Sequence, residues 1–296
     1  MKPNNRRAAQ GGFSLVEILV SLVIGLFVVG AVLTNYIGSG TAGNQQSQIS
    51  QMTEDAQIAF MMLARDAQMA GYVEAEGILA TGGGGTATFA RLKDFRPVFG
   101  CNNSFQTATV AFGTATCAAG TGSHALEVNY QATTATAVLT SGGVPTDCLG
   151  NEITPEAVGG PPTVNAYFVS NRYYVSSGTG RPELHCASQA ATASGGQPIA
   201  ENVQEMRVWY GEAVDWAAAT PATRQPVRYV TASDVTQWPS VVAVRVCLLM
   251  RTAEPVLTAE DVQTYRDCAG ATQTSPDRRI YRAFFSTMAL RNKVGF

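Results

Sequence analysis

Residues 13–33 read FSLVEILVSLVIGLFVVGAVL, and Glu17 carries the only ionisable side chain among them. An α-helix of about 20 apolar residues crosses the hydrocarbon core of a bilayer, so this stretch predicts a membrane-spanning helix. The preceding residues 1–12, MKPNNRRAAQGG, are basic and contain no acid. Because basic flanks stay on the cytoplasmic side, the rest of the chain is expected on the other side of the membrane.

Three kinds of N-terminal segment begin with a basic leader and an apolar stretch. A cleaved secretory signal has a shorter apolar region followed by a small-residue cleavage site, whereas this stretch is long and has a carboxylate near its beginning. A plain membrane anchor does not require the order of residues at the junction, which is Gly11-Gly12 followed by Phe13-Ser14-Leu15-Val16-Glu17. This order resembles the class III signal of type IV prepilins and pseudopilins, which prepilin peptidase cuts after the glycine.

The resemblance assigns roles to three residues. It implies cleavage between Gly12 and Phe13, N-methylation of Phe13, and an assembly role for Glu17, which pairs with the N-terminal amine of a neighbouring subunit in that family. Glu17 would lie in the first turn of the helix, where the helix dipole favours an anion. The alternative for Glu17 is an interfacial residue that reaches the lipid headgroups. Removal of the leader, with its Lys and two Arg, would change the formal net charge from −2 to −5.

The chain divides into four expected regions: a leader at 1–12, the membrane and filament-core half of a long helix at 13–37, a glycine-rich break with an amphipathic half at 38–71, and a β-rich globular domain outside the cytoplasm at 72–296. The glycines at 38–43 weaken a helix, so a break or a melted stretch is expected there, with a loop between two helices as the alternative. Helical periodicity resumes after them, and Gly71 suits a C-cap. The expected apolar stripe consists of Ile49, Met52, Ala56, Phe60, Leu63, Ala67 and Ala70.

Strands dominate the remainder of the expected fold. The predicted strands are 125–131, 135–140, 166–170, 172–176, 203–210, 241–251 and 279–291, separated by turn-rich stretches such as 141–145 and 159–162. In the fifth strand Val203, Glu205, Arg207 and Trp209 are expected to share one face. In the sixth the shared face is expected to contain Val242, Val244, Val246, Leu248 and Met250. The fold class is therefore α+β, with a long N-terminal helix packed on a mainly antiparallel sheet with long loops.

The six cysteines are expected to form disulfides, because the N-terminal segment places them outside the cytoplasm. They are Cys101, Cys117, Cys148, Cys186, Cys247 and Cys268. Six cysteines allow 15 connectivities, and pairing of sequence neighbours is favoured among them. A metal site is the alternative, but the CxxC or clustered Cys/His spacing that it needs is missing from the sequence.

The sequence predicts no enzyme, cofactor or metal. His124 and His185 lie outside nucleophile motifs such as GxSxG and are expected at the surface or at strand ends. The run Gly82–Gly85 lacks the Gly-Lys-Ser/Thr ending of a phosphate loop and predicts a turn. Glu254, Glu260 and Asp261 favour a solvated loop over a calcium site, because the EF-hand pattern is absent. The net charge of −2 disfavours nucleic acid as a partner.

Five segments of the chain resemble the PilW family of minor type IV pilins. They are 12–35, 63–72 (LARDAQMAGY), 203–211 (VQEMRVWYG), 241–252 (VVAVRVCLLMRT) and 279–292 (RIYRAFFSTMALRN). The resemblance implies a minor pilin that primes pilus assembly and ends at or near the filament tip. Its partners would be other minor pilins, the major pilin, the inner-membrane assembly platform, prepilin peptidase and a large tip adhesin.

The same resemblance implies a location in the bacterial inner membrane before assembly and at the pilus tip on the cell surface afterwards. The length and the six cysteines argue against the major pilin, which is usually about half this size. A pseudopilin of type II secretion is the nearest alternative, and a membrane-anchored periplasmic binding protein or enzyme is a second one. The kind of pilus activity, whether twitching, adhesion or DNA uptake, stays open.

Overall fold

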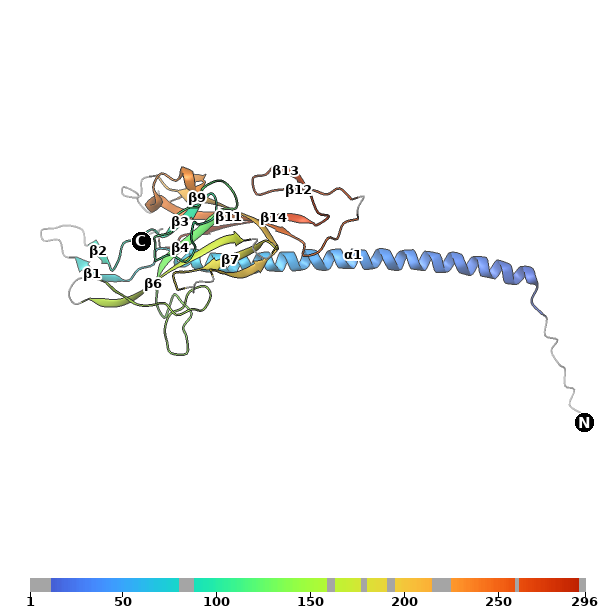
Figure 1. Cartoon of the computed structure of the whole chain (residues 1–296), viewed down its shortest axis with the longest axis horizontal. Coiled ribbons are helices and arrows are strands. Elements are labelled where there is room, and N and C mark those ends of the chain that lie inside the picture. Colours follow the sequence, from blue (N-terminus) through green and yellow to red (C-terminus); the bar gives the residue numbers. More distant parts are fainter. Residues whose placement is uncertain are drawn as a thin grey trace, which may run out of the picture. The chain divides into compact units, whose positions relative to one another are not determined.

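A computed structural model describes residues 12–79, 88–158, 163–176, 180–190, 195–214, 225–258 and 261–292 (Figure 1). The chain forms two compact units, Met1–Gln48 and Ile49–Phe296, and each is considered by itself. The first unit consists of the N-terminal part of helix α1 (Leu15–Met69). The second contains the rest of this helix and the strands of the described residues.

Helix α1 is continuous, so the predicted break at 38–43 is wrong, and so is a loop between two helices. A glycine costs a helix about 1 kcal/mol, which is less than the cost of stopping the helix and nucleating a second one. Two hydroxyls in this stretch also bond back to helix carbonyls: Ser39 donates to Tyr36 C=O at 3.0 Å, and Thr41 donates to Gly38 C=O at 2.9 Å. The glycines therefore lie inside a regular helix.

Two antiparallel sheets make up most of the second unit. The first has the order β3-β4-β6-β7-β8, with β5 also paired to β6, and the second has the order β10-β9-β11-β14. The strands of the first sheet are β3 (Val98–Cys101), β4 (Ala125–Ala132), β5 (Glu156–Val158), β6 (Val164–Ser176), β7 (Glu183–Ala187) and β8 (Gln197–Glu201). Those of the second are β9 (Val203–Glu212), β10 (Arg228–Val230), β11 (Val241–Arg251) and β14 (Tyr281–Ala289).

Shorter elements complete the described part of this unit. They are the two-stranded sheets β1 (Ala75–Leu79) with β2 (Thr88–Arg91) and β12 (Thr264–Arg266) with β13 (Thr272–Thr274), and the 3-10 helices η2 (Ala232–Asp234) and η3 (Trp238–Ser240). The named strands pair antiparallel throughout. The predicted α+β class is confirmed.

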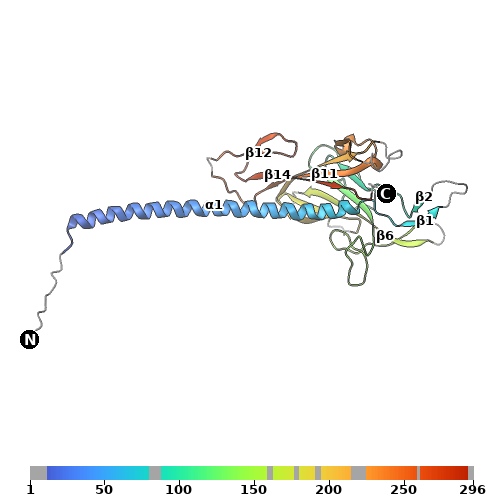
Figure 2. The ribbon, with the colours of Figure 1, turned by 180° about the vertical axis from the view of Figure 1, so that it is seen from behind.

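The C-terminal half of α1 lies along the two sheets and shares one core with them (Figure 2). Its buried side chains are Met52, Ala56, Ala59, Leu63, Ala67 and Ala70. The predicted stripe is therefore confirmed in its main part, while Ile49 and Phe60 are only partly buried. The helix stops as expected at Gly71, whose φ of 73° is in the left-handed region and whose N–H donates to Asn129 C=O at 2.8 Å.

Several strand predictions hold, and others need correction. The strands predicted at 125–131, 203–210 and 241–251 correspond to β4, β9 and β11, while those at 166–170 and 172–176 are one strand, β6. The prediction at 279–291 corresponds to the shorter β14. Residues 135–140 are not a strand, because Thr136 folds back to donate to Gln131 C=O at 2.9 Å and accepts from Thr133 N–H at 2.8 Å, which stabilises a turn.

At both ends of the β9–β11 pair, β-bulges make the observed faces differ from the predicted ones. The register shifts between Leu249 and Met250, and as a result Val203 lies in the core with Met206 and Val208 instead of sharing the face of Glu205. A second shift between Val241 and Ala243 places Val241 in the core in place of Val242. The alternating core face otherwise runs through Val244, Val246, Leu248 and Met250 as expected.

The six cysteines form three disulfides between sequence neighbours, Cys101–Cys117, Cys148–Cys186 and Cys247–Cys268. Each closes a loop onto a strand of a main sheet, at the end of β3, within β7 and within β11 respectively. These links hold long loops against the sheets. The predicted turns at 82–85 and 159–162 lie outside the described residues.

Candidate functional site

The predicted processing and assembly residues lie at the beginning of α1. Gly12 and Phe13 precede the helix, and the Phe13 side chain is 80% exposed. Glu17 lies in the first turn, where the unpaired helix N–H groups favour a carboxylate. The large apolar side chains that follow, up to Leu33, are exposed. In the described part of the chain, α1 is the helix that is long and apolar enough to cross a membrane.

This geometry is compatible with the predicted chemistry of the N-terminal segment. The Gly12–Phe13 peptide bond is outside the helix, so a peptidase could reach it without unwinding a helical turn. Cleavage there would place a free amine two residues before the helix begins at Leu15. The cut, the methylation of Phe13 and the role of Glu17 remain predictions.

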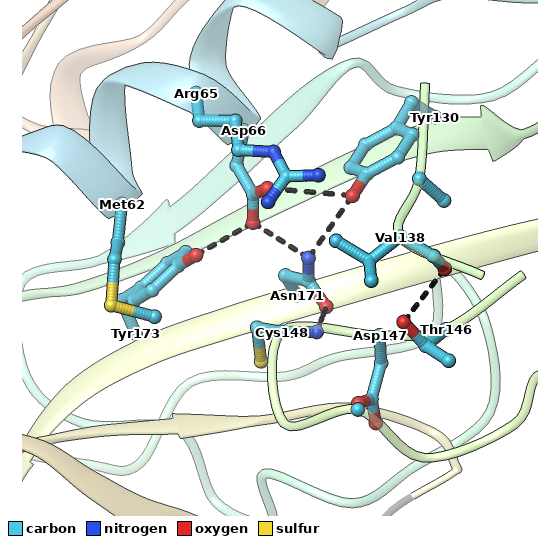
Figure 3. Close-up of a pocket in the computed structure, with 12 residues that line it drawn as sticks. Met62, Arg65, Asp66, Tyr130, Val138, Thr146, Asp147, Cys148, Asn171 and Tyr173 are labelled. Atoms are coloured by element: carbon cyan, nitrogen blue, oxygen red, sulfur yellow. Dashed lines mark hydrogen bonds between the residues drawn. The ribbon is translucent and has the colours of Figure 1, made fainter. Parts of the chain in front are cut away.

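A second cluster of polar side chains lies at the other end of α1, where a buried acid joins the helix to the first sheet (Figure 3). Asp66 is 6% exposed, and its carboxylate accepts hydrogen bonds from the Tyr173 hydroxyl and from Asn171 Nδ2, both at 2.6 Å. The Tyr130 hydroxyl donates a longer bond of 3.4 Å. Tyr130 comes from β4, and Asn171 and Tyr173 come from β6, so one side chain of α1 links two neighbouring strands.

Burial determines the protonation of this cluster. It raises the pKa of Asp66, although the hydrogen bonds from Tyr173 and Asn171 oppose the shift. Burial, together with the nearby Asp66 charge, also raises the pKa of Tyr130 and Tyr173, so both hydroxyls keep their protons and act as donors. A cavity of about 260 Å³ adjoins the cluster, and the exposed Arg65 is among its lining residues.

The chemistry of this cluster is structural. Asp147, the second acid at the cavity, accepts hydrogen bonds from the N–H groups of Leu149 and Asn151 and from the Ser188 hydroxyl. Its oxygens are therefore used in a local turn and in a bond to Ser188, which is 41 positions away. The groups around Asp66 satisfy one another and hold the helix in register on the sheet.

The end of the described chain returns to the same end of α1. Asn292 Nδ2 lies 3.1 Å from the carbonyl oxygens of both Gln68 and Met69, and 3.3 Å from that of Ala70. The last carbonyls of a helix have no partner within the helix, so this amide acts as a C-cap supplied by a residue more than 200 positions away. Leu290, two residues earlier, is fully buried in the common core.

A buried ion pair forms the other polar centre of the first sheet. Arg172 Nε donates to the Glu127 carboxylate at 2.7 Å, and both side chains are fully buried. The remaining guanidinium N–H groups donate to the carbonyls of Ala108, Val110 and Ala111, at 2.8 to 3.0 Å. The Cys101–Cys117 disulfide encloses this loop. Arg172 therefore fixes a loop that has little regular structure of its own.

The histidines considered from the sequence have structural partners. His124 is at a strand end as expected, directly before β4, but it is buried, and its Nδ1 accepts from Val208 N–H at 3.1 Å. Burial lowers the pKa of His124, so the neutral ring links the beginning of β4 to β9. His185 is half-buried in the middle of β7 and not at its end, so the expected position is wrong for this residue; its Nε2 lies 3.2 Å from a carboxylate oxygen of Glu183.

The acidic group near 254–261 does not converge in the described structure. Glu254 is exposed, and Glu260 lies outside the described residues. The Asp261 carboxylate accepts hydrogen bonds from Thr258 N–H at 3.0 Å and from the Thr258 hydroxyl at 2.9 Å, which form a local turn. Within the residues described, no three His, Cys, Asp or Glu side chains are arranged to hold a metal ion.

Comparison with known proteins gives matches to the N-terminal segment and to the fold. Residues 7–33 match the prokaryotic N-terminal methylation motif. A type IV-like pilin from Thermus thermophilus, known as a solved structure, is similar over 81% of this chain and 97% of its own, with 12% sequence identity and a TM-score of 0.36. No curated protein sequence matches. The matched motif shows that the chain begins with a segment like that of type IV prepilins.

The resemblance to the PilW family is confirmed. Residues 172–292 match the family described as type IV pilus-assembly protein W. The matched range begins at the buried Arg172 and ends at the capping Asn292. It therefore contains two of the side chains that join distant parts of the second unit.

Proposed function

We propose that this chain is a minor pilin of a type IV pilus. In this proposal it helps to prime pilus assembly and stays at or near the filament tip within a minor-pilin complex. The observation that carries the proposal is the presence, in one chain, of the methylation motif at 7–33 and the PilW match at 172–292.

The N-terminal segment would act in two steps. The apolar helix first holds the precursor in the inner membrane while prepilin peptidase cuts between Gly12 and Phe13. Glu17 then pairs with the new amine of a neighbouring subunit as the helix moves into the filament, because a carboxylate in an apolar environment needs a charged partner. This pairing selects subunits that have been processed.

The globular domain would supply the contacts that distinguish a minor pilin from the major one. Its loops are held to the sheets by three disulfides, which suits a domain that leaves the cytoplasm and reaches the cell surface. The expected partners are other minor pilins, the major pilin, the inner-membrane assembly platform and a large tip adhesin.

Processing and location test the proposal together. Mass spectrometry of the membrane-bound protein should find a mature N-terminus at Phe13, methylated, while Gly12→Val should leave the full-length precursor because a branched side chain obstructs the peptidase. Gly25→Val is the matched control, since Gly25 lies in the middle of the apolar helix and a side chain there meets no described atom within 4 Å. This variant should be cut normally.

Gold labelling of an epitope tag on the wild-type protein should then mark one end of sheared pili. Label distributed along the whole filament would contradict the tip location. Loss of type II secretion with normal pili after deletion of the gene would favour a pseudopilin instead.

A further inference from the structure

Strand β14 is an outer strand of the second sheet, and one of its two edges pairs with no other described strand. The hairpin β12–β13 packs beside its first residues, where Tyr265 stacks on Tyr281 (Figure 1). The other edge of β14 pairs with β11 from Tyr281 to Ala289 without a register shift. Just beyond the two ends, Leu290 N–H donates to Val242 C=O and Thr252 N–H donates to Ile280 C=O, both at 2.9 Å. The even-numbered residues of this segment therefore direct their backbone groups toward β11.

Backbone groups alternate in direction along a strand, so the odd-numbered residues of β14 point away from β11. From the half-buried Ala283 onward these are Ala283, Phe285, Thr287 and Ala289, and the last three are exposed. Their outward N–H and C=O groups have no hydrogen-bond partner among the residues described. An open row of this kind can pair with another strand.

The other outer strands of the two sheets are shorter or interrupted. β3 has four residues and β10 has three, while β8 has five residues and contains Pro198. β14 has nine residues and contains neither proline nor lysine, which are common protections of a sheet edge. This edge is therefore the one best suited to accept an added strand.

The face beside the open edge contains side chains that are typical of binding surfaces. Phe285 is 48% exposed, its ring stacks on that of Trp209 with centroids 6.5 Å apart, and the Arg245 guanidinium lies 5.3 Å from its centroid. These residues come from three adjacent strands, β14, β9 and β11. Aromatic residues and arginine supply much of the binding energy at protein interfaces.

The charge of this region is positive, although the whole chain is acidic. Arg245, on the face of Phe285, and Arg291, just beyond the strand, are exposed and form no ion pair with any described residue. Arg282 is also exposed, but its side chain is on the opposite face of β14, the face of Phe284 and Met288. The acids closest to them in the sheet are already neutralised: Glu205 pairs with Arg207, and Asp277 pairs with both Arg251 and Arg279. An acidic partner would complement the free Arg245 and Arg291.

We infer that the open edge of β14 binds an extended acidic segment of another polypeptide, which adds to the sheet as a strand beside β14. The backbone row would supply main-chain hydrogen bonds, and the arginines with Phe285 would select the sequence. A nucleic acid would use the arginines but would leave the outward N–H and C=O groups without partners, so the geometry favours a peptide. This inference goes beyond the proposed function, because it does not depend on which filament the chain enters.

The test uses the full chain in detergent micelles and a fluorescent nine-residue peptide of alternating Glu and Val. Thr287→Pro removes an outward N–H that takes no part in the pairing with β11, and Thr287→Val is the matched control that keeps this N–H. Wild type and Thr287→Val should bind the peptide equally, and Thr287→Pro should bind at least about fivefold more weakly, the effect of one net hydrogen bond. Equal binding by Thr287→Pro would overturn the inference.

Two further measurements keep the test decisive if Thr287→Pro does not fold. The same peptide with alternate backbone amides N-methylated should lose binding to wild type, because it can no longer pair along one edge. Arg245→Glu should weaken binding of the acidic peptide and favour binding of a Lys/Val version. Binding of an oligonucleotide that competes with the peptide and is unaffected by Thr287→Pro would instead identify a phosphate-binding surface and contradict strand addition.

Discussion

Replacement of Asp66 should show how strongly the end of α1 is held to the first sheet. In the wild type the Tyr173 hydroxyl and Asn171 Nδ2 both donate to Asp66 at 2.6 Å. In Asp66→Ala these two groups would stay buried without an acceptor. Each such group costs about 1–3 kcal/mol, so the two together should lower the free energy of unfolding by about 4 kcal/mol. That is a large fraction of the stability of a typical domain, about 5–15 kcal/mol.

The matched variant Asp66→Asn keeps the shape and one acceptor oxygen but cannot ionise. The expected change is within about 1 kcal/mol, since the oxygen can accept from Tyr173 and Asn171 while the new amide faces Tyr130. The two variants also differ from wild type in pH dependence. Burial raises the pKa of Asp66 above its ordinary 3.8, so the folded state binds this proton more tightly than the unfolded state. Wild type should therefore lose stability as the pH rises through that raised pKa.

The assay is urea unfolding of the oxidised full chain in detergent, followed by tryptophan fluorescence from pH 3 to 8. Asp66→Asn should not show the loss of stability with rising pH that the carboxyl causes in wild type. If Asp66→Ala is as stable as Asp66→Asn, the Asp66 cluster shown in Figure 3 does not hold the helix on the first sheet.

Two further predictions concern the links that close the second unit. Asn292→Ala should remove the cap of α1 and lower the free energy of unfolding by about 1 kcal/mol. Asn292→Asp should lower it further, because it adds a negative charge beside the helix carbonyls. Equal stability of wild type and both variants in the same urea assay would refute the cap. Replacing Cys101 and Cys117 together by serine should lower the free energy of unfolding by about 3 kcal/mol and make the loop held by Arg172 sensitive to limited proteolysis. An unchanged digestion pattern would mean that the disulfide does not order this loop.

The parts of the fold that depend on nearby residues could be predicted from the sequence. Periodicity of 3 and 4 located the buried stripe of α1, and alternation located β4, β9 and β11, because both patterns follow from the geometry of the element itself. The glycines at 38–43 led to a wrong prediction because the fate of that stretch depends on the helix on both sides of it. A local propensity of about 1 kcal/mol per glycine was outweighed by the cooperativity of the helix on both sides.

The parts that depend on distant residues could not be predicted. The bulge that moves Val203 into the core is defined by its pairing with Met250, and the cap of α1 comes from Asn292. Asn171 was even placed in a gap between two predicted strands, although it is a buried partner of Asp66. Polar residues inside otherwise apolar strands were the available indication, but the sequence does not say which of them meet.

The most direct test of the central claim follows Glu17→Ala from the membrane to the pilus. The variant should insert into the inner membrane and be cut as wild type is, since the substitution removes a polar group from an apolar helix. It should be depleted from sheared pili on the order of a hundredfold, because loss of one member of a buried ion pair costs about 3–5 kcal/mol. Equal amounts of the Glu17→Ala and wild-type proteins in sheared pili would contradict the claim that this chain enters the filament through that carboxylate.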